Sequence, residues 1–225
     1  MAATMKKTVE LFYDVVSPYT WFAFEVLCRY QDRWNINLQL KPVFLGGIRK
    51  GADNPPPDLV SNRGLYLRKE LKLLAKYFHV PLVEPQNTAE MMFVKGTLKT
   101  QRFITAVDIM DSTKTEELSR QMWHRNWSRD EDVTEPASLK ESGKRAGLSD
   151  AQISRGLEDM QSSEVKARLK QFTDEALNHG AFGSPTIIAH TSDGPVMLFG
   201  SDRFPILAQV LDEKWEGTVP GESKL

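Results

Sequence analysis

A serine and a threonine stand three residues apart directly after the first apolar segment of the chain, at Ser17 and Thr20, with Pro18 between them. A Ser-Pro pair is typical of a helix start, because proline suits the first helical position and the serine oxygen accepts a hydrogen bond from an orphan amide. A helix start also attracts an anion, since it presents unpaired amides and the positive end of the helix dipole. The pattern predicts either a plain helix cap or an anion site at Ser17.

A second signal lies far along the chain in the sequence Phe-Gly-Ser-Pro-Thr, residues 182–186. A proline that opens a strand cannot donate a hydrogen bond to the neighbouring strand, so its presence needs a reason. The usual reason is a cis peptide bond in a tight turn. We therefore predict a cis bond between Ser184 and Pro185, and the alternative is a trans proline at a sheet edge.

The chain has a single cysteine, Cys28, which falls well inside the first expected helix and is interpreted as a packing residue. A disulfide framework, a Cys-rich zinc site and a Cys-x-x-Cys redox pair are therefore excluded. The four histidines lack the spacing of metal ligands, so no metal site is expected. If Ser17 serves an anion such as a thiolate, the sulfur must come from another molecule.

Such a site would lower the pKa of a thiol supplied by another molecule enough to make it reactive. Free thiols have a pKa of ~8.5, so few are ionised at neutral pH. A helix N-terminus contributes ~0.3–2 kcal/mol toward the anion, and a hydrogen bond to a charged acceptor ~1.5–3 kcal/mol. At ~1.36 kcal/mol per unit, the two effects lower the thiol pKa by about two units.

Hydrophobic patterning places these two loops among strands and helices. Residues 8–16 are predicted as a strand, 18–34 as a helix and 35–44 as a strand parallel to the first, and the glycine-rich segment after residue 45 as a loop. A long helical region follows, with a capping box at Ser149 and Gln152. The chain then closes with two more strands and a helix. The further predicted helices are around 67–78, 88–110, 115–127, 136–146, 149–160, 163–179 and 203–215, and the strands are 186–190 and 196–199.

This order, βαβ followed by helices and then ββα, is that of an α/β thioredoxin-like domain with a large all-helical insertion. We expect the thioredoxin-like domain to comprise residues 1–50 and 180–225, and the inserted helical domain residues 51–179. In such a fold the loop after the first strand meets the loop before the third. The sequence therefore predicts that Ser17 lies close to Ser184.

Composition restricts the class of protein. The 225 residues carry 29 Lys and Arg against 30 Asp and Glu, with 40% hydrophobic residues, which is ordinary for a globular chain. Without a basic excess, nucleic-acid binding is not expected. No stretch approaches the ~18 apolar residues of a membrane span. The last tripeptide, Ser223-Lys224-Leu225, matches a peroxisomal import signal read by a receptor, so a peroxisomal location is expected. A mitochondrial or cytosolic location is the alternative.

Several segments together carry a family resemblance. They are residues 12–21 (FYDVVSPYTW), 182–185 (FGSP) and 199–203 (FGSDR), with Trp127-Ser128-Arg129 and Glu135-Pro136 between them. Each motif alone is weak, but their order over the whole chain resembles the kappa-class glutathione transferases. The resemblance implies a DsbA-like helical insertion, a homodimer, and glutathione as cosubstrate without a tightly bound cofactor.

The resemblance also implies a role for individual residues. Ser17 would be the catalytic hydroxyl, and the Ser184 backbone would pair with the cysteinyl part of glutathione. Asp202 would bind the γ-glutamyl ammonium, and Ser201 its carboxylate while capping the last helix. Position 184 is serine where leucine is expected in mammalian members, which predicts a more polar wall. The full set of implied glutathione contacts is Ser17, Pro18, Tyr19, Asn54, Arg63, Ser184, Pro185, Ser201 and Asp202.

The implied activity is conjugation of glutathione to small hydrophobic electrophiles, with reduction of organic or lipid hydroperoxides as a further reaction in detoxification. Two alternatives stay open: a glutathione-dependent isomerase of the 2-hydroxychromene-2-carboxylate type, and a non-catalytic DsbA-like chaperone or interaction protein. Asp14 is expected to make structural hydrogen bonds. Trp123 and Trp127 are expected in the core or at a dimer surface, with a place in the wall of the electrophile pocket as the alternative.

Overall fold

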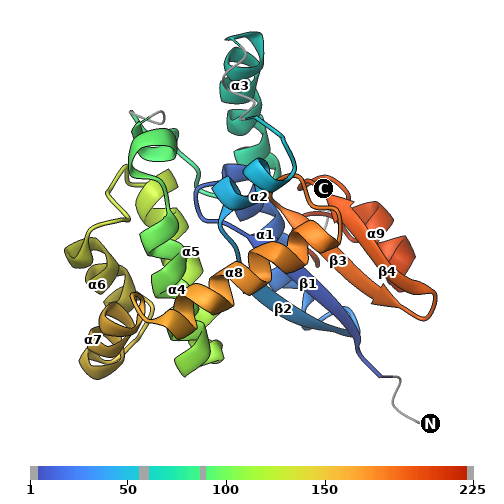
Figure 1. The fold of residues 1–225 in the computed structure, drawn as a ribbon. Helices are drawn as coiled ribbons and strands as arrows, with labels where there is room; N and C mark the ends of the chain where they lie inside the picture. The colour runs from blue at the N-terminus through green and yellow to red at the C-terminus, as the bar shows by residue number, and fades with distance from the viewer. Residues whose placement is uncertain (1–4, 56–60, 87–89, 222–225) are drawn as a thin grey trace.

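The computed structural model describes residues 5–55, 61–86 and 90–221 (Figure 1). Its centre is a four-stranded sheet in the order β2-β1-β3-β4. β1 (Lys7–Tyr13) runs parallel to β2 (Ile36–Pro42) and antiparallel to β3 (Thr186–Thr191), which pairs with β4 (Gly194–Phe199) through a tight hairpin. This confirms the predicted α/β thioredoxin-like order and the parallel first pair.

Helices cover both faces of the sheet because side chains alternate along each strand. Val9, Leu11 and Tyr13 of β1 pack with α1 (Pro18–Tyr30) and α9 (Phe204–Leu211) in the main core. Phe12 and Ile188 face the other way and join a second cluster with α2 (Leu45–Gly51) and α8 (Ser163–Asn178). In Figure 1 the long α8 crosses the front of the sheet.

The helical segment between β2 and β3 begins with α2 and ends with α8. α3 (Ser61–Tyr77) projects away from the body, whereas the helices labelled α4 to α7 gather at one side of the sheet (Figure 1). The residue limits of the two domains stay a prediction. The remaining elements are a π-helical turn η2 (Glu90–Lys95), α4 (Leu98–Met110), a short 3-10 turn η3 (Ser112–Lys114), α5 (Thr115–Trp127), α6 (Pro136–Arg145) and α7 (Asp150–Asp159).

Two parts of the predicted pattern differ from the structure. The glycine-rich segment expected as a loop forms α2, and a Cβ at Gly51 would lie 2.7 Å from the Leu177 side chain of α8, so glycine permits the close approach. The predicted helix over 88–110 is interrupted at Gly96, whose φ of +60° suits glycine and separates η2 from α4. Thr88, where that helix was expected to begin, lies outside the described residues.

Element ends also differ from the predictions. β1 stops at Tyr13 rather than residue 16, because the Asp14 side chain accepts from the Val16 amide and turns the chain. α1 ends at Tyr30 instead of residue 34, and α9 ends at Leu211, where Asp212 adopts a left-handed conformation. By contrast α5 has the predicted bounds, and the capping box of Ser149 with Gln152 is present.

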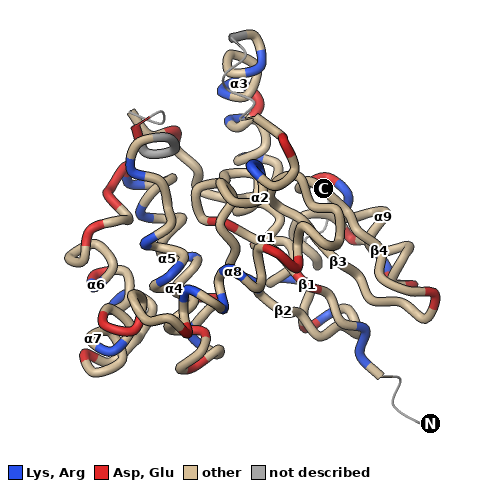
Figure 2. Tube along the Cα trace, in the orientation of Figure 1, with Lys and Arg blue, Asp and Glu red and all other residues tan. Residues whose placement is uncertain are grey.

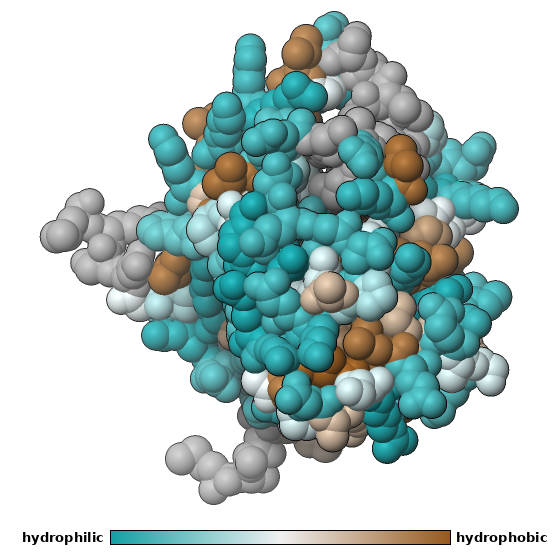
Figure 3. Space-filling model, turned by 90° about the vertical axis from the view of Figure 1, so that its left-hand side faces the viewer, coloured by the Kyte–Doolittle hydropathy of each residue, from teal (hydrophilic) through white to brown (hydrophobic). Residues whose placement is uncertain are grey.

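The surface has the mixed character expected from balanced charge. Figure 2 shows Lys and Arg interspersed with Asp and Glu along the helical region. The face in Figure 3 is mainly hydrophilic, with an apolar area in its lower part. Within residues 5–55, 61–86 and 90–221, no helix has the length and apolar character needed to cross a membrane.

Candidate active site

The two loops singled out in the sequence meet at the N-terminus of α1. Ser17 caps this helix, and its Oγ accepts a hydrogen bond from the Thr20 amide at 3.2 Å. The same hydroxyl donates to the Ser184 carbonyl at 3.3 Å. The Ser184–Pro185 bond is cis, as predicted. Ser17 therefore combines its capping role with a position beside the cis-proline loop.

The Ser184 side chain is directed into the protein. Its Oγ lies 2.9 Å from Thr20 Oγ1 and donates to the Phe12 carbonyl at 3.3 Å. The residue is only 9% exposed. The Ser184 hydroxyl therefore links β1, α1 and the cis-proline loop by hydrogen bonds. Because it is directed inward, the cavity wall is less polar than the sequence suggested.

A cavity of about 930 Å³ opens beside these loops. Its walls come from the start of α1, the segment after α2, one side of α3, the cis-proline loop and the turn between β4 and α9. The structure thus brings together side chains that lie up to 186 residues apart in the sequence, from Ser17 to Arg203. All residues implied as glutathione contacts line it: Ser17, Pro18, Tyr19, Asn54, Arg63, Ser184, Pro185, Ser201 and Asp202.

The turn before α9 differs in detail from the expectation. The residue at the N-cap of α9 is Arg203, and no side chain caps this helix, so the predicted capping role of Ser201 is wrong. Ser201 is 4% exposed, whereas the Asp202 carboxylate is exposed and forms an ion pair with the neighbouring Arg203 guanidinium. An incoming ammonium group would therefore share the Asp202 carboxylate with Arg203.

The opposite wall is tied to the site by two hydrogen bonds. Asn54 Nδ2 donates to the Phe182 carbonyl at 2.7 Å, which links the end of α2 to the cis-proline loop. The Tyr19 hydroxyl donates to the Glu70 carboxylate of α3. Burial, and then the hydrogen bond to Glu70, raise the pKa of Tyr19, so its phenol stays a neutral donor. Arg63 lines the cavity from the same helix.

Helix α5 supports the loop that follows β1, which the sequence did not reveal. Trp123 Nε1 donates to the Ser17 carbonyl at 3.1 Å, and Trp127 Nε1 donates to the Val16 carbonyl at 3.2 Å. Both tryptophans are fully buried, as expected of core residues, and Trp127 also lines the cavity. Their four-residue spacing on α5 indicates a buried helix face, but it does not name a hydrogen-bond partner more than 100 residues away.

Two buried polar side chains complete this support. Gln101 of α4 donates to the carbonyls of Tyr13 and Val43 at 2.9 and 2.8 Å, joining the ends of β1 and β2. Asp14 accepts hydrogen bonds from the Val16 amide, the Leu45 amide and the Thr97 hydroxyl. Burial raises the pKa of Asp14, while these hydrogen bonds oppose the rise. Asp14 has the structural role expected of it.

Cys28 does not contribute a nucleophile. Burial is the main cause that raises the pKa of its thiol well above the ordinary value, so the sulfur stays protonated. Its partly buried side chain packs against the main core. The position fits the packing role predicted from the sequence.

A group of potential metal ligands lies under α8, away from the cavity. Ligand atoms of Glu10, Glu175 and His179 lie within 4.8 Å of one another. The Lys41 ammonium, however, lies between the two carboxylates, 2.5 Å from Glu10 Oε1 and 2.6 Å from Glu175 Oε1. A second contact joins His190 Nε2 and Glu10 Oε2 at 2.9 Å. The protein therefore supplies its own cation to this cluster.

Comparison with known proteins agrees with this geometry. Residues 8–212 match the family model for a DSBA-like thioredoxin domain. The chain is 46% identical over 216 residues to human glutathione S-transferase kappa 1, covering 96% of both chains, and 45% identical over 214 residues to the Rattus norvegicus protein of that name, covering 95% of both. A solved 2-hydroxychromene-2-carboxylate isomerase superposes with a TM-score of 0.71 at 18% identity, covering 91% of this chain and 94% of its own. The chain belongs to the kappa class of glutathione S-transferases, within the DsbA-like thioredoxin family.

Proposed function

We propose that this glutathione transferase uses Ser17 to hold the sulfur of bound glutathione as a thiolate and presents it to small apolar electrophiles. The observation that carries the proposal is the position of Ser17, a buried N-cap hydroxyl that lies against the cis-proline loop at the inner end of the cavity. Ser17 and Thr20 occupy the two places that cysteines hold in a Cys-x-x-Cys redox site, so the ligand must bring the sulfur.

The chemical step follows from this arrangement. The thiol proton leaves to solvent, and the Ser17 hydroxyl turns from the Ser184 carbonyl to donate to the thiolate. The present bond to Ser184 is long at 3.3 Å, so little is lost in that turn. The sulfur then forms a bond to the electrophilic carbon. With an activated haloarene, the halide leaves with the bonding electron pair, and no other oxidant or reductant is consumed.

Hydroperoxides are the second proposed substrate class. The thiolate sulfur would attack the terminal peroxide oxygen, and the released alkoxide would take a proton to become an alcohol. The resulting glutathione sulfenic acid would react with a second glutathione to give the disulfide and water. The isomerase alternative has less support, because the solved isomerase is similar in fold at 18% sequence identity.

We also propose a homodimer that contacts through α3. Leu65, Tyr66, Leu73 and Tyr77 are 57–68% exposed, and the last three are spaced at 66, 73 and 77, along one side of the helix. A second copy of this chain could cover that apolar side. The expected result is a dimer mass in light scattering that falls toward the monomer in the double variant Tyr66→Ser, Leu73→Ser. A non-catalytic interaction protein would dimerise but fail to bind millimolar glutathione.

For location, we propose peroxisomal import through Ser223-Lys224-Leu225, which lies outside the described residues. A fluorescent protein fused to the amino end leaves this tripeptide free. The fusion is expected to collect in peroxisomes and to lose that location when Leu225 is deleted. Equal distribution of the two fusions would contradict the proposal.

The main proposal is tested by titrating the sulfur of bound glutathione through its thiolate absorbance in the ultraviolet. In the wild type the bound thiol is expected to have a pKa about two units below the ~8.5 of a free thiol. In Ser17→Ala the pKa of the bound thiol should rise again by about one to two units. The matched control is Ser162→Ala, which removes the N-cap of α8 and leaves the cavity intact. A thiol pKa that is unchanged on binding would refute the proposed role of Ser17.

A further inference from the structure

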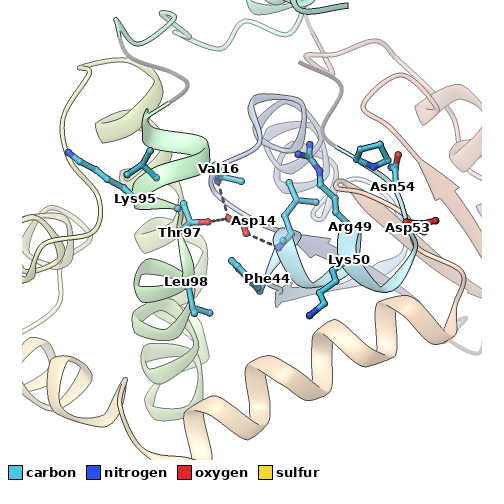
Figure 4. Close-up of a pocket in the computed structure, with 15 residues that line it drawn as sticks. Asp14, Val16, Phe44, Arg49, Lys50, Asp53, Asn54, Lys95, Thr97 and Leu98 are labelled. Carbon is cyan, nitrogen blue, oxygen red and sulfur yellow. Dashed lines mark hydrogen bonds between the residues drawn. The ribbon is translucent and has the colours of Figure 1, made fainter. Parts of the chain in front are cut away.

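A second cavity of about 660 Å³ adjoins the first, between α2 and the turn from η2 into α4 (Figure 4). The two cavities share four lining residues, Leu45, Arg49, Asn54 and Pro55. Val16 lines the second cavity and its neighbour Ser17 lines the first. The boundary between the two cavities therefore lies next to the position proposed for the glutathione sulfur.

Apolar side chains form part of the lining of this second cavity. Of the apolar residues that line it, Val16 and Leu45 are buried, and Phe44 and Leu98 are half-buried. The Thr97 hydroxyl is only 2% exposed and donates to Asp14. Such a lining favours the hydrocarbon or aromatic part of a ligand.

Among the described residues, Arg49 is the charged side chain that lines both cavities. It is half-buried on α2, and its charge reaches inward far enough to act on the buried Asp14 carboxylate. Figure 4 shows Arg49 and Lys50 leaving α2 in opposite directions, with Lys50 directed toward α8. Lys95 is directed away from α2.

Two carboxylates also line this cavity and must be weighed against an anionic ligand. Asp14 is fully buried, and its oxygens accept three hydrogen bonds from the protein, from Val16, Leu45 and Thr97. Asp53 lies exposed at the rim, where solvent screens its charge. Neither Asp14 nor Asp53 therefore prevents the half-buried Arg49 guanidinium from attracting a ligand carboxylate, with which it can form paired hydrogen bonds.

We propose that the second cavity holds the acidic end of an amphipathic electrophile, whose carboxylate pairs with Arg49 while its reactive carbon lies at the glutathione sulfur beside Ser17. This inference rests on the proposed function, since the sulfur must be there to react. The enzyme would then prefer electrophiles that have an apolar body and carry one carboxylate. Arg49 is thus a specificity-determining residue rather than part of the thiol activation.

The test uses two probes of similar shape, 4-chloro-3-nitrobenzoate and the uncharged 4-chloro-3-nitrobenzamide. In both, the thiolate forms a bond to the chlorine-bearing carbon, and chloride leaves with the electron pair. Replacing the guanidinium in Arg49→Gln is expected to raise KM for the benzoate about tenfold with kcat unchanged, and to change the benzamide less than twofold. Arg49→Lys should recover part of the loss, because it keeps the charge without the paired donors.

The control variant is Arg155→Gln, which removes an exposed arginine of α7 that pairs with Asp159. It is expected to leave both probes unaffected. If Arg49→Gln raises KM for both probes equally, or weakens glutathione binding instead, Arg49 serves another group and the inference is wrong. If the benzamide is turned over but Arg49→Gln does not change KM for the benzoate, this inference is wrong while the proposed function stands. A wild type that conjugates neither probe contradicts the proposed function as well.

Discussion

The inner end of the larger cavity and its outer rim are held in different ways. At the inner end Ser17 and Ser184 are 5% and 9% exposed, and Trp123 and Gln101 bind the adjoining backbone from the helical region. At the rim the Asp202 side chain is 63% exposed, and its partner there is the adjacent Arg203. One end is fixed by buried hydrogen bonds, and the other is exposed to water.

This difference separates two roles. A buried donor acts on the sulfur through a medium of low dielectric constant, so small displacements change the thiol pKa and the rate. An exposed charge is screened and contributes little to a bound ligand. We therefore expect substitutions at the inner end to change kcat and the pH profile, and substitutions at the rim to change KM for glutathione.

The largest effect is expected from Ser17→Ala. Loss of a hydrogen bond to a charged acceptor, about 1.5–3 kcal/mol, corresponds to a roughly 10- to 150-fold lower kcat/KM. Steady-state conjugation of 1-chloro-2,4-dinitrobenzene at several pH values measures this, and the rise of rate with pH should move to higher pH. A variant that keeps the wild-type pH profile would show that the inner end does not set the reactivity.

Trp123→Phe tests whether support from α5 matters for the rate. The change removes the hydrogen bond to the Ser17 carbonyl, worth about 0.5–1.5 kcal/mol, so kcat should fall roughly two- to tenfold. Trp21→Phe is the matched control, because Trp21 is also fully buried but donates to Glu25 on α1. Both variants should be less stable to heat. Equal loss of kcat in both would mean that stability, not loop support, explains the effect.

At the rim, Asp202→Asn is expected to raise KM for glutathione by at most about fivefold, since an exposed ion pair contributes about 0.2–1 kcal/mol. The kcat at saturating glutathione should not change. Asp193→Asn, in the exposed β3–β4 turn, serves as control. A fall in kcat with an unchanged KM would reverse the roles assigned to the two ends.

The smallest effect on activity is expected from Glu10→Gln, under α8. Burial tends to raise the pKa of Glu10, but hydrogen bonds from Lys41 and His190 outweigh it and hold the pKa below its ordinary 4.5. The ionised Glu10 therefore stabilises the fold above that value, and this contribution disappears as the pH falls through the lowered pKa. Wild type should exceed the variant in stability at pH 7, with the gap closing below pH 4.5 and kcat at pH 7 unchanged. Urea unfolding at a series of pH values measures the gap, and a constant gap would contradict the assignment.

Much of the site was predictable because its signals are local. The N-cap at Ser17 follows from a Ser-Pro pair after a strand, and the cis bond at Ser184 from a proline that opens a strand. The α2 helix was not predictable in this way, since two adjacent glycines disfavour a helix in isolation. Packing against α8 stabilises it instead, and Gly51 permits the close contact.

The order of strands and helices, the helix cap at Ser17 and the absence of a protein thiol at that cap follow from the sequence alone. Only the tertiary structure decided that Trp123 supports Ser17, that Lys41 lies between Glu10 and Glu175, and that Arg49 borders both cavities. The physical reason is that caps and turns depend on neighbours within a few residues. The partner of a buried donor or charge depends on how helices cross, which no local spacing records.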